Sequence, residues 1–256
     1  LAIASFSQTN SALPADVWEW DSKAPICALK QRPSADGQIV KIERTPGNDE
    51  TVLQITLPVG SKLQEGHFPN ANVETKSGRR FGADISIRVW NGRRELYVVS
   101  PDPALIDNLS NTTSLSFSHP KLGNVGVPIR ILSTLVDTLR ECEDKIMSEW
   151  GIDPTAWRSL KSRPLPLANI RNRFNDLDYP REALAANVEA DAIIRLDVAA
   201  DGTAGACRSL NRGLMPGFQT AACKVLKGAR FQPATDSGGT SVTAPIVYDV
   251  RFRIGN

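Results

Sequence analysis

The fold of the C-terminal segment is decided by the stretch Ile246-Val247-Tyr248-Asp249-Val250-Arg251-Phe252-Arg253-Ile254. Every second side chain is apolar, beginning with Ile246, and the alternate positions are mostly charged. Because successive side chains of a β-strand point to opposite faces, alternation with period two indicates a half-buried strand. The sequence therefore predicts a long final strand with one face in a core.

Four further elements are expected before this strand. A short helix is predicted over residues 180–187, with a proline at its first turn. One strand follows over residues 193–199 and another over 203–211, with turn residues between them. An apolar stripe at helical spacing from Phe218 to Leu226 indicates a second helix. The predicted order is helix, strand, strand, helix, strand.

Five short motifs stand in a fixed order in this segment. They are Tyr179-Pro180, Asp201-Gly202, Ala221-Ala222, Phe231-Gln232-Pro233-Ala234 and Val250-Arg251-Phe252. With this order and spacing, the segment resembles the TonB C-terminal domain family. The resemblance covers about a third of the chain and implies an αββαβ domain over residues 178–256.

The resemblance also implies a way of binding. In that family, the domain receives an extended segment of an outer-membrane transporter, which adds as a strand to the sheet. By analogy, the last strand is the receiving edge, helped by the segment before Tyr179. The partner-binding residues expected in this way are Ile246, Val247, Tyr248, Asp249, Val250, Arg251, Phe252, Asp176 and Asp178. The alternative is that this edge is covered by the N-terminal domain or by a second copy of the chain in a homodimer.

Residues 26–118 indicate a series of short strands. Apolar and polar side chains alternate in segments such as 39–43 and 52–57, and Asn91-Gly92 between two such segments is typical of a type I′ hairpin. Many short strands with regular turns suggest an antiparallel sandwich or barrel. From Leu132 to Ile146 the period becomes helical. We expect residues 1–157 to form an antiparallel β-rich domain with a closing helix, and the chain to be of the α+β class.

Residues 158–177 are predicted to link the two domains. Pro164 and Pro166 discourage regular structure there. The stretch is also basic, because Arg158, Lys161, Arg163, Arg171 and Arg173 precede any acidic residue in it. We expect a solvated linker, and the alternative is a segment that contacts an anionic surface.

The four cysteines are Cys27, Cys142, Cys207 and Cys223, and none belongs to a Cys-x-x-Cys pair. An even number with wide spacing fits two disulfides in an oxidising compartment, and four reduced thiols are the alternative. Four cysteines allow three connectivities. A division into two domains favours Cys27 with Cys142 and Cys207 with Cys223. No zinc site is expected, because the only two histidines are not near a cysteine in sequence.

Charge and motifs argue against several classes of function. The 30 Lys and Arg nearly balance the 28 Asp and Glu, so the net charge of +2 gives no reason to expect a nucleic-acid partner. No apolar stretch is long enough for a transmembrane helix. A Ser–His–acid triad would require His67 or His119, which lie in loop-like sequence, and no nucleophile elbow or phosphate-binding motif is present. We expect neither catalysis nor a cofactor.

Three hypotheses follow from the sequence. The first is a periplasmic TonB-like module that binds an outer-membrane transporter or another envelope protein, with any membrane anchor lying outside this sequence. The second is a structural envelope protein whose N-terminal domain binds a ligand. The five tryptophans are candidates to line its groove, and the favoured alternative is that they belong to the core. The third, a hydrolase, has the weakest support.

Overall fold

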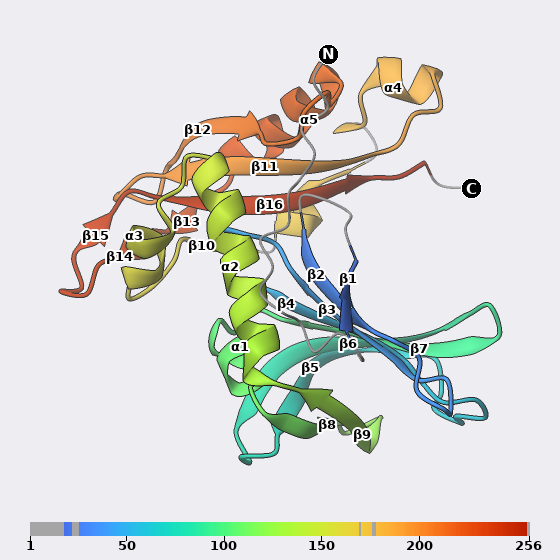
Figure 1. Ribbon diagram of the computed structural model, residues 1–256. Coiled ribbons are helices and arrows are strands. Elements are labelled where there is room, and N and C mark those ends of the chain that lie inside the picture. Colours follow the sequence, from blue (N-terminus) through green and yellow to red (C-terminus); the bar gives the residue numbers. More distant parts are fainter. Residues whose placement is uncertain (1–17, 22–25, 169, 176–177, 255–256) are drawn as a thin grey trace. The chain divides into compact units, whose positions relative to one another are not determined.

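The computed structural model describes residues 18–21, 26–168, 170–175 and 178–254, and it is of the α+β class, which confirms the expected fold class (Figure 1). The chain divides into two compact units. Unit 1 consists of Leu1–Arg44 and Asp49–Cys142, and unit 2 consists of Thr45–Asn48 and Glu143–Asn256. The point of division between these units lies inside a helix, and the domain boundary expected after residue 157 stays a prediction.

Unit 1 is built on a nine-stranded antiparallel sheet with the strand order β1-β2-β3-β4-β7-β6-β5-β8-β9. Its strands are β1 (Trp18–Trp20), β2 (Cys27–Gln31), β3 (Ile39–Arg44), β4 (Thr51–Thr56), β5 (Gly66–Thr75), β6 (Arg80–Trp90), β7 (Arg93–Ser100), β8 (Thr112–His119) and β9 (Gly123–Ile131). Two helices accompany the sheet, α1 (Ala104–Asn108) and α2 (Ser133–Glu149).

The sheet follows the alternation in the sequence. Val40, Ile42, Leu53 and Ile55 are fully buried, while the residues between them are partly exposed. Asn91 and Gly92 join β6 to β7, and both have positive φ, at 48° and 72°, as a type I′ turn requires. The local pattern therefore determined which face of these strands enters the core.

The strands β1, β5 and β9 were not expected from the sequence, and β5 and β9 each contain a proline. Pro69 precedes Asn70, which has φ of 57°, and the pairing of β5 with β6 shifts register between Phe68 and Ala71. A β-bulge of this kind accommodates a residue that interrupts the ladder. Pro128 lies in β9, which is an edge strand, where a missing N–H is tolerated. His67 belongs to β5 and His119 ends β8, so neither histidine lies in a loop.

The sheet of unit 1 curls until its two edges approach each other. The indole Nε1 of Trp18 in β1 donates to the carbonyl of Arg130 in β9 at 3.3 Å. The amide Nε2 of Gln38 donates to the carbonyl of Pro128 at 3.1 Å. Trp18 is only 3 % exposed, so it belongs to the core of unit 1.

The middle of α2 is fastened to the sheet by the disulfide Cys27–Cys142, whose Cα atoms are 5.9 Å apart. Leu135 and Leu139 on the same helix are fully buried. The second disulfide is Cys207–Cys223 in unit 2. These are the two pairs that the division into domains favoured.

Unit 2 contains the predicted helix–strand–strand–helix–strand order as α4, β11, β12, α5 and β16. Its elements are α3 (Pro154–Ser159), β10 (Leu165–Pro166), the 3-10 helix η1 (Ile170–Arg173), α4 (Arg181–Ala185), β11 (Ala190–Val198), β12 (Ala204–Ser209), α5 (Pro216–Lys227), β13 (Phe231–Gln232), β14 (Ala234–Thr235), β15 (Ser241–Val242) and β16 (Ala244–Phe252). The main sheet has the order β12-β11-β16, and two short ribbons pair β10 with β13 and β14 with β15.

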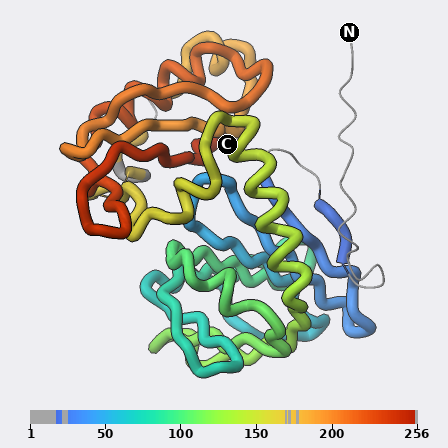
Figure 2. Tube along the Cα trace, turned by 60° about the vertical axis from the view of Figure 1, so that its left-hand side comes forward, coloured from blue at the N-terminus to red at the C-terminus, as the bar shows by residue number. Residues whose placement is uncertain are grey.

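The proline-containing basic stretch is hydrogen-bonded within unit 2. The backbone N–H of Lys161 donates to the carbonyl of Thr235 at 2.8 Å, and that of Leu167 donates to Arg230 at 2.9 Å. Between them, β10 pairs with β13. In Figure 2 this yellow segment runs beside the red C-terminal part of the chain. A fully solvated linker would leave these backbone groups to water. The independent folding of residues 1–157 and 178–256 stays a prediction.

We expect the loss of the disulfide Cys27–Cys142 to destabilise the protein more than the loss of Cys207–Cys223. The first bridge spans 115 residues and the second spans 16. In the chain-entropy model these loops correspond to about 5 and about 3 kcal/mol of unfolding free energy. Denaturant unfolding of the two Cys→Ala double variants, followed by circular dichroism, measures both effects. A larger loss for the Cys207–Cys223 variant would contradict this ranking.

Candidate functional site

The candidate site is the outer edge of β16. This strand pairs with β11 along its whole length, from Ala190 opposite Phe252 to Val198 opposite Ala244. β11 also pairs with β12 on its other side, so β16 is the last strand of the three (Figure 1). Within the described part of the chain, no strand pairs with the other side of β16.

One face of this sheet is packed against α5. Phe218, Ala222 and Leu226 of the helix belong to the same buried cluster as alternate residues of β11, namely Ala192, Ile194, Leu196 and Val198. Val250 and Phe252 of β16 extend the cluster, and the rings of Phe218 and Phe252 lie 4.9 Å apart between centroids. The disulfide Cys207–Cys223 fastens β12 to α5. The face that the sequence predicted to be apolar is therefore the one that packs against the helix.

The opposite face is also covered, which the sequence did not indicate. The alternation places Val247 on the same strand face as Asp249, Arg251 and Arg253, yet Val247 is fully buried. It shares a second cluster with Ile193 and with residues that follow the middle of α2, namely Met147, Trp150, Ile152 and Trp157. These two tryptophans are 8 % and 7 % exposed. They are core residues of unit 2 and do not line a groove.

The end of α2 is held on this face by arginines. Gly151, with φ of 70°, ends the helix in a Schellman motif, in which the N–H of Ile152 donates to Met147 and that of Gly151 to Ser148. Arg195 donates to the carbonyls of Trp150 and Gly151, each at 3.0 Å, and Arg208 donates to Trp150 at 2.6 Å. Cations at the C-terminal end of a helix also interact favourably with its dipole.

Two outward-facing groups of β16 already have partners inside unit 2. The N–H of Val247 donates to the carbonyl of Gly47 at 3.0 Å, and the carbonyl of Pro245 accepts from Nε1 of Trp157 at 3.3 Å. In an antiparallel ladder, alternate residues direct their backbone groups toward and away from the neighbouring strand. Since Val247 points away from β11 and the register is continuous, the N–H of Asp249 also points outward.

Asp249 carries a carboxylate that is only 16 % exposed. Its Oδ2 accepts from Nε of Arg251 at 3.0 Å, and its Oδ1 is buried without a hydrogen-bond partner among the described residues. Burial raises the pKa of this carboxyl above its ordinary value, and the nearby Arg251 offsets only part of that effect. The ionised form of Asp249 therefore costs folding free energy.

The remaining residues expected at the site have varied surroundings. Ile246 and Tyr248 are half-buried, Val250 and Phe252 are buried, and Arg251 is exposed. Asp176 lies outside the described residues.

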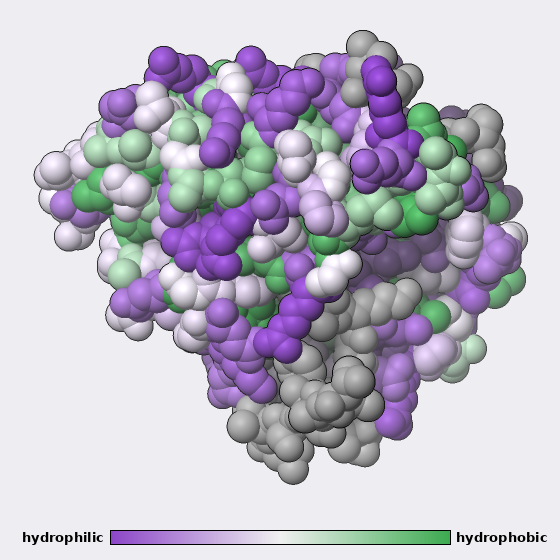
Figure 3. Space-filling view, turned by 90° about the horizontal axis from the view of Figure 1, so that it is seen from above, coloured by the Kyte–Doolittle hydropathy of each residue, from purple (hydrophilic) through white to green (hydrophobic). Residues whose placement is uncertain are grey.

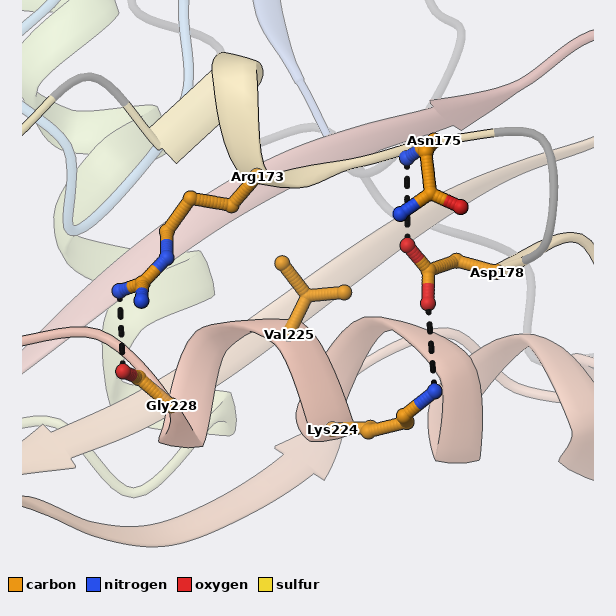
Figure 4. A pocket seen from close by; sticks show the side chains of 6 residues that line it. All are labelled: Arg173, Asn175, Asp178, Lys224, Val225 and Gly228. Carbon is orange, nitrogen blue, oxygen red and sulfur yellow. Dashed lines mark hydrogen bonds and ion pairs between the residues drawn. The ribbon is translucent and has the colours of Figure 1, made fainter.

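Asp178 contacts Lys224 of α5 and the backbone of Asn175, which lies three residues earlier in the chain. Its Oδ2 accepts from the backbone N–H of Asn175 at 3.1 Å, and its Oδ1 lies 3.4 Å from Nζ of Lys224. Figure 4 shows these contacts in a shallow pocket of about 230 Å³, where Arg173 donates to the carbonyl of Gly228. The carboxylate of Asp178 is thus engaged with α5.

The face seen in Figure 3 mixes small hydrophobic areas with hydrophilic ones. Among the residues that the structure describes, no group of three or more His, Cys, Asp and Glu side chains is suited to hold a metal ion. Within the same residues, no helix is both long and apolar enough to cross a membrane.

Gly47 and Trp157 were not expected as neighbours of β16. Pro46-Gly47-Asn48-Asp49 has the composition of a turn, and Trp157 is a large aromatic side chain. Neither pattern carries information on which distant strand the residue will meet. Gly47 and Val247 are far apart in the chain, so only the tertiary structure shows that they are in contact.

We predict that Asp249→Asn raises the unfolding free energy at pH 7, because an amide avoids the cost of a buried charge. Since the folded-state pKa of Asp249 is raised above 3.8, the parent protein loses stability as pH rises between 3.8 and that raised value. The advantage of the variant should therefore be absent well below pH 3.8 and complete once the pH exceeds the raised folded-state pKa of Asp249. Thermal or denaturant unfolding across this range measures it. Destabilisation by Asp249→Asn at pH 7 would show that the ion pair with Arg251 outweighs the burial cost.

Comparison with known families agrees with this arrangement. Residues 175–254 match the family described as the Gram-negative bacterial TonB protein C-terminal. A search of curated proteins finds no match to the chain. The matched segment contains α4, β11, β12, α5 and β16, which are the elements of the three-stranded sheet and its helices. Residues 175–254 are therefore a TonB C-terminal domain.

Proposed function

We propose that unit 2 is a periplasmic interaction module that binds a segment of an outer-membrane transporter by strand addition to β16. The observation that carries this proposal is the position of β16 at the edge of the sheet in the TonB C-terminal domain. An edge strand exposes a row of N–H and C=O groups that can pair with another chain. The role is one of binding in transport across the envelope and involves no catalysis.

The packing of unit 2 supports the edge as the contact region. Apolar clusters cover both faces of the sheet, one with Phe218 of α5 and the other with Trp150 and Trp157. Both faces of the sheet are therefore already covered within unit 2. The backbone N–H and C=O groups along the outer edge of β16 are the groups to which a partner strand would bind. The two disulfides fit a protein that works in an oxidising compartment such as the periplasm.

Asp249 is the most suitable residue of β16 for a substitution that tests strand addition. Its N–H points outward, so a proline there removes a donor that strand addition needs and places its ring on the same side. Val247 is less suitable, because its side chain is fully buried and its N–H already donates to Gly47.

We expect Asp249→Pro to weaken binding of a transporter segment at least tenfold, while Asp249→Asn stays close to the parent protein. Loss of a backbone hydrogen bond costs about 1 kcal/mol, and the steric clash adds to this. The probes are synthetic peptides copied from the periplasm-facing segments of TonB-dependent transporters, and calorimetry with the full chain measures their affinity. Asn is the matched control, because it keeps both the backbone N–H and the side-chain shape.

Circular dichroism and unfolding of each variant check that the sheet is intact. Equal affinities of the proline variant and the parent would contradict strand addition at this edge. Light scattering tests the homodimer, since a second copy paired along β16 would give a dimer that dissociates when peptide binds. If the parent bound none of the peptides, the transporter-binding function itself would be wrong.

A further inference from the structure

We infer that Thr45–Asn48 is a displaceable cap on the receiving edge of β16, and that it competes with the incoming strand for the N–H of Val247. This inference rests on the function proposed above and concerns the regulation of the same site. The cap belongs to unit 2, together with the sheet that it contacts.

The first observation is the hydrogen bond itself. The N–H of Val247 points outward and donates to the carbonyl of Gly47 at 3.0 Å. A strand that added along β16 would offer its own carbonyl to the same N–H. A backbone amide has one hydrogen to donate, so the cap and the partner strand exclude each other at this position.

The second observation is the close fit of the cap. The N–H of Asn48 donates to the carbonyl of Thr45 at 3.0 Å, which closes a turn with Pro46 and Gly47 at its centre. Gly47 has φ of 74°, and a Cβ atom on it would lie 2.7 Å from Cγ2 of Val247 and 3.4 Å from Cδ1 of Ile152. The turn can therefore lie against β16 only because residue 47 has no side chain.

The third observation is how little of the edge the cap occupies. Among the described residues, the backbone-to-backbone hydrogen bond between the cap and β16 is the one at Val247, and the cap does not continue as a strand. Immediately before Val247, the carbonyl of Pro245 is taken by the indole of Trp157, and proline has no N–H. A partner strand therefore reaches its last available donor at Val247, where it must displace the turn. A ladder of several hydrogen bonds can replace one, which makes the cap displaceable.

Gly47→Ala tests the cap, and Gly60→Ala is its matched control. Both glycines have positive φ, at 74° and 85°, so alanine strains the backbone similarly at either position. A Cβ on Gly60 meets no atom within 4 Å, whereas a Cβ on Gly47 meets Val247. The two variants differ in the clash with β16.

The experiment uses the full chain and two measurements. Amide hydrogen exchange at Val247, followed by NMR, should become at least tenfold faster in Gly47→Ala and stay unchanged in Gly60→Ala. Calorimetry with the transporter peptides should give at least threefold tighter binding for Gly47→Ala, because the partner no longer competes with the cap. In the parent protein, saturating peptide should keep the Val247 amide protected while shifting the NMR signals of Gly47 and Asn48. That last measurement needs no variant and remains decisive if Gly47→Ala fails to fold.

The outcomes separate the inference from the proposed function. If the parent binds a peptide and the signals of Gly47 and Asn48 do not move, or if Gly47→Ala binds no more tightly, the inference is wrong and the proposed function stands. Unchanged exchange at Val247 in a folded Gly47→Ala also overturns the inference. If no variant binds any peptide, both are wrong.

Discussion

An edge strand has a hydrogen-bonded neighbour on one side only, and this constraint organises unit 2. β16 satisfies half of its backbone groups through β11. The outward groups must find water, another part of the chain or a partner, because unpaired groups are costly once buried. Near Pro245 and Val247 the protein itself supplies the partners, an indole N–H from Trp157 and a carbonyl from Gly47. The outward N–H of Asp249 follows next along the strand.

Packing on both faces of the sheet holds the edge strand β16 in a fixed conformation. α5 buries one face, and residues from Met147 to Trp157 bury the other, where Arg195 and Arg208 hold the end of α2. Packing against a helix is one of the ways in which a small sheet becomes independently stable, and here the second face is covered as well. With both faces packed, the strand is held in a fixed extended shape, and a partner need not order it on binding. Preorganisation of this kind reduces the entropic cost of association.

The local sequence predicted the elements of unit 2 well and their surroundings poorly. Alternation from Ile246 to Ile254 located β16, and the apolar stripe at helical spacing from Phe218 to Leu226 located α5. The same alternation placed Val247 on a mostly polar face, although it is fully buried. Periodicity reports the average character of a face, and it cannot report that tryptophans remote in sequence will cover one position. In unit 1, Pro69 and Pro128 concealed β5 and β9, because a bulge and an edge accommodate residues that sequence patterns treat as breaks.

We propose that a partner strand pairs with the outer edge of β16. Isotope-edited NMR of the full chain bound to a transporter peptide detects close contacts between backbone protons of the two chains and so observes this pairing directly. We expect contacts from the peptide to the amide protons of Val247 and Asp249 in the alternating pattern of a β-ladder. Contacts confined to the pocket that contains Arg173 and Lys224, with none along β16, would contradict it.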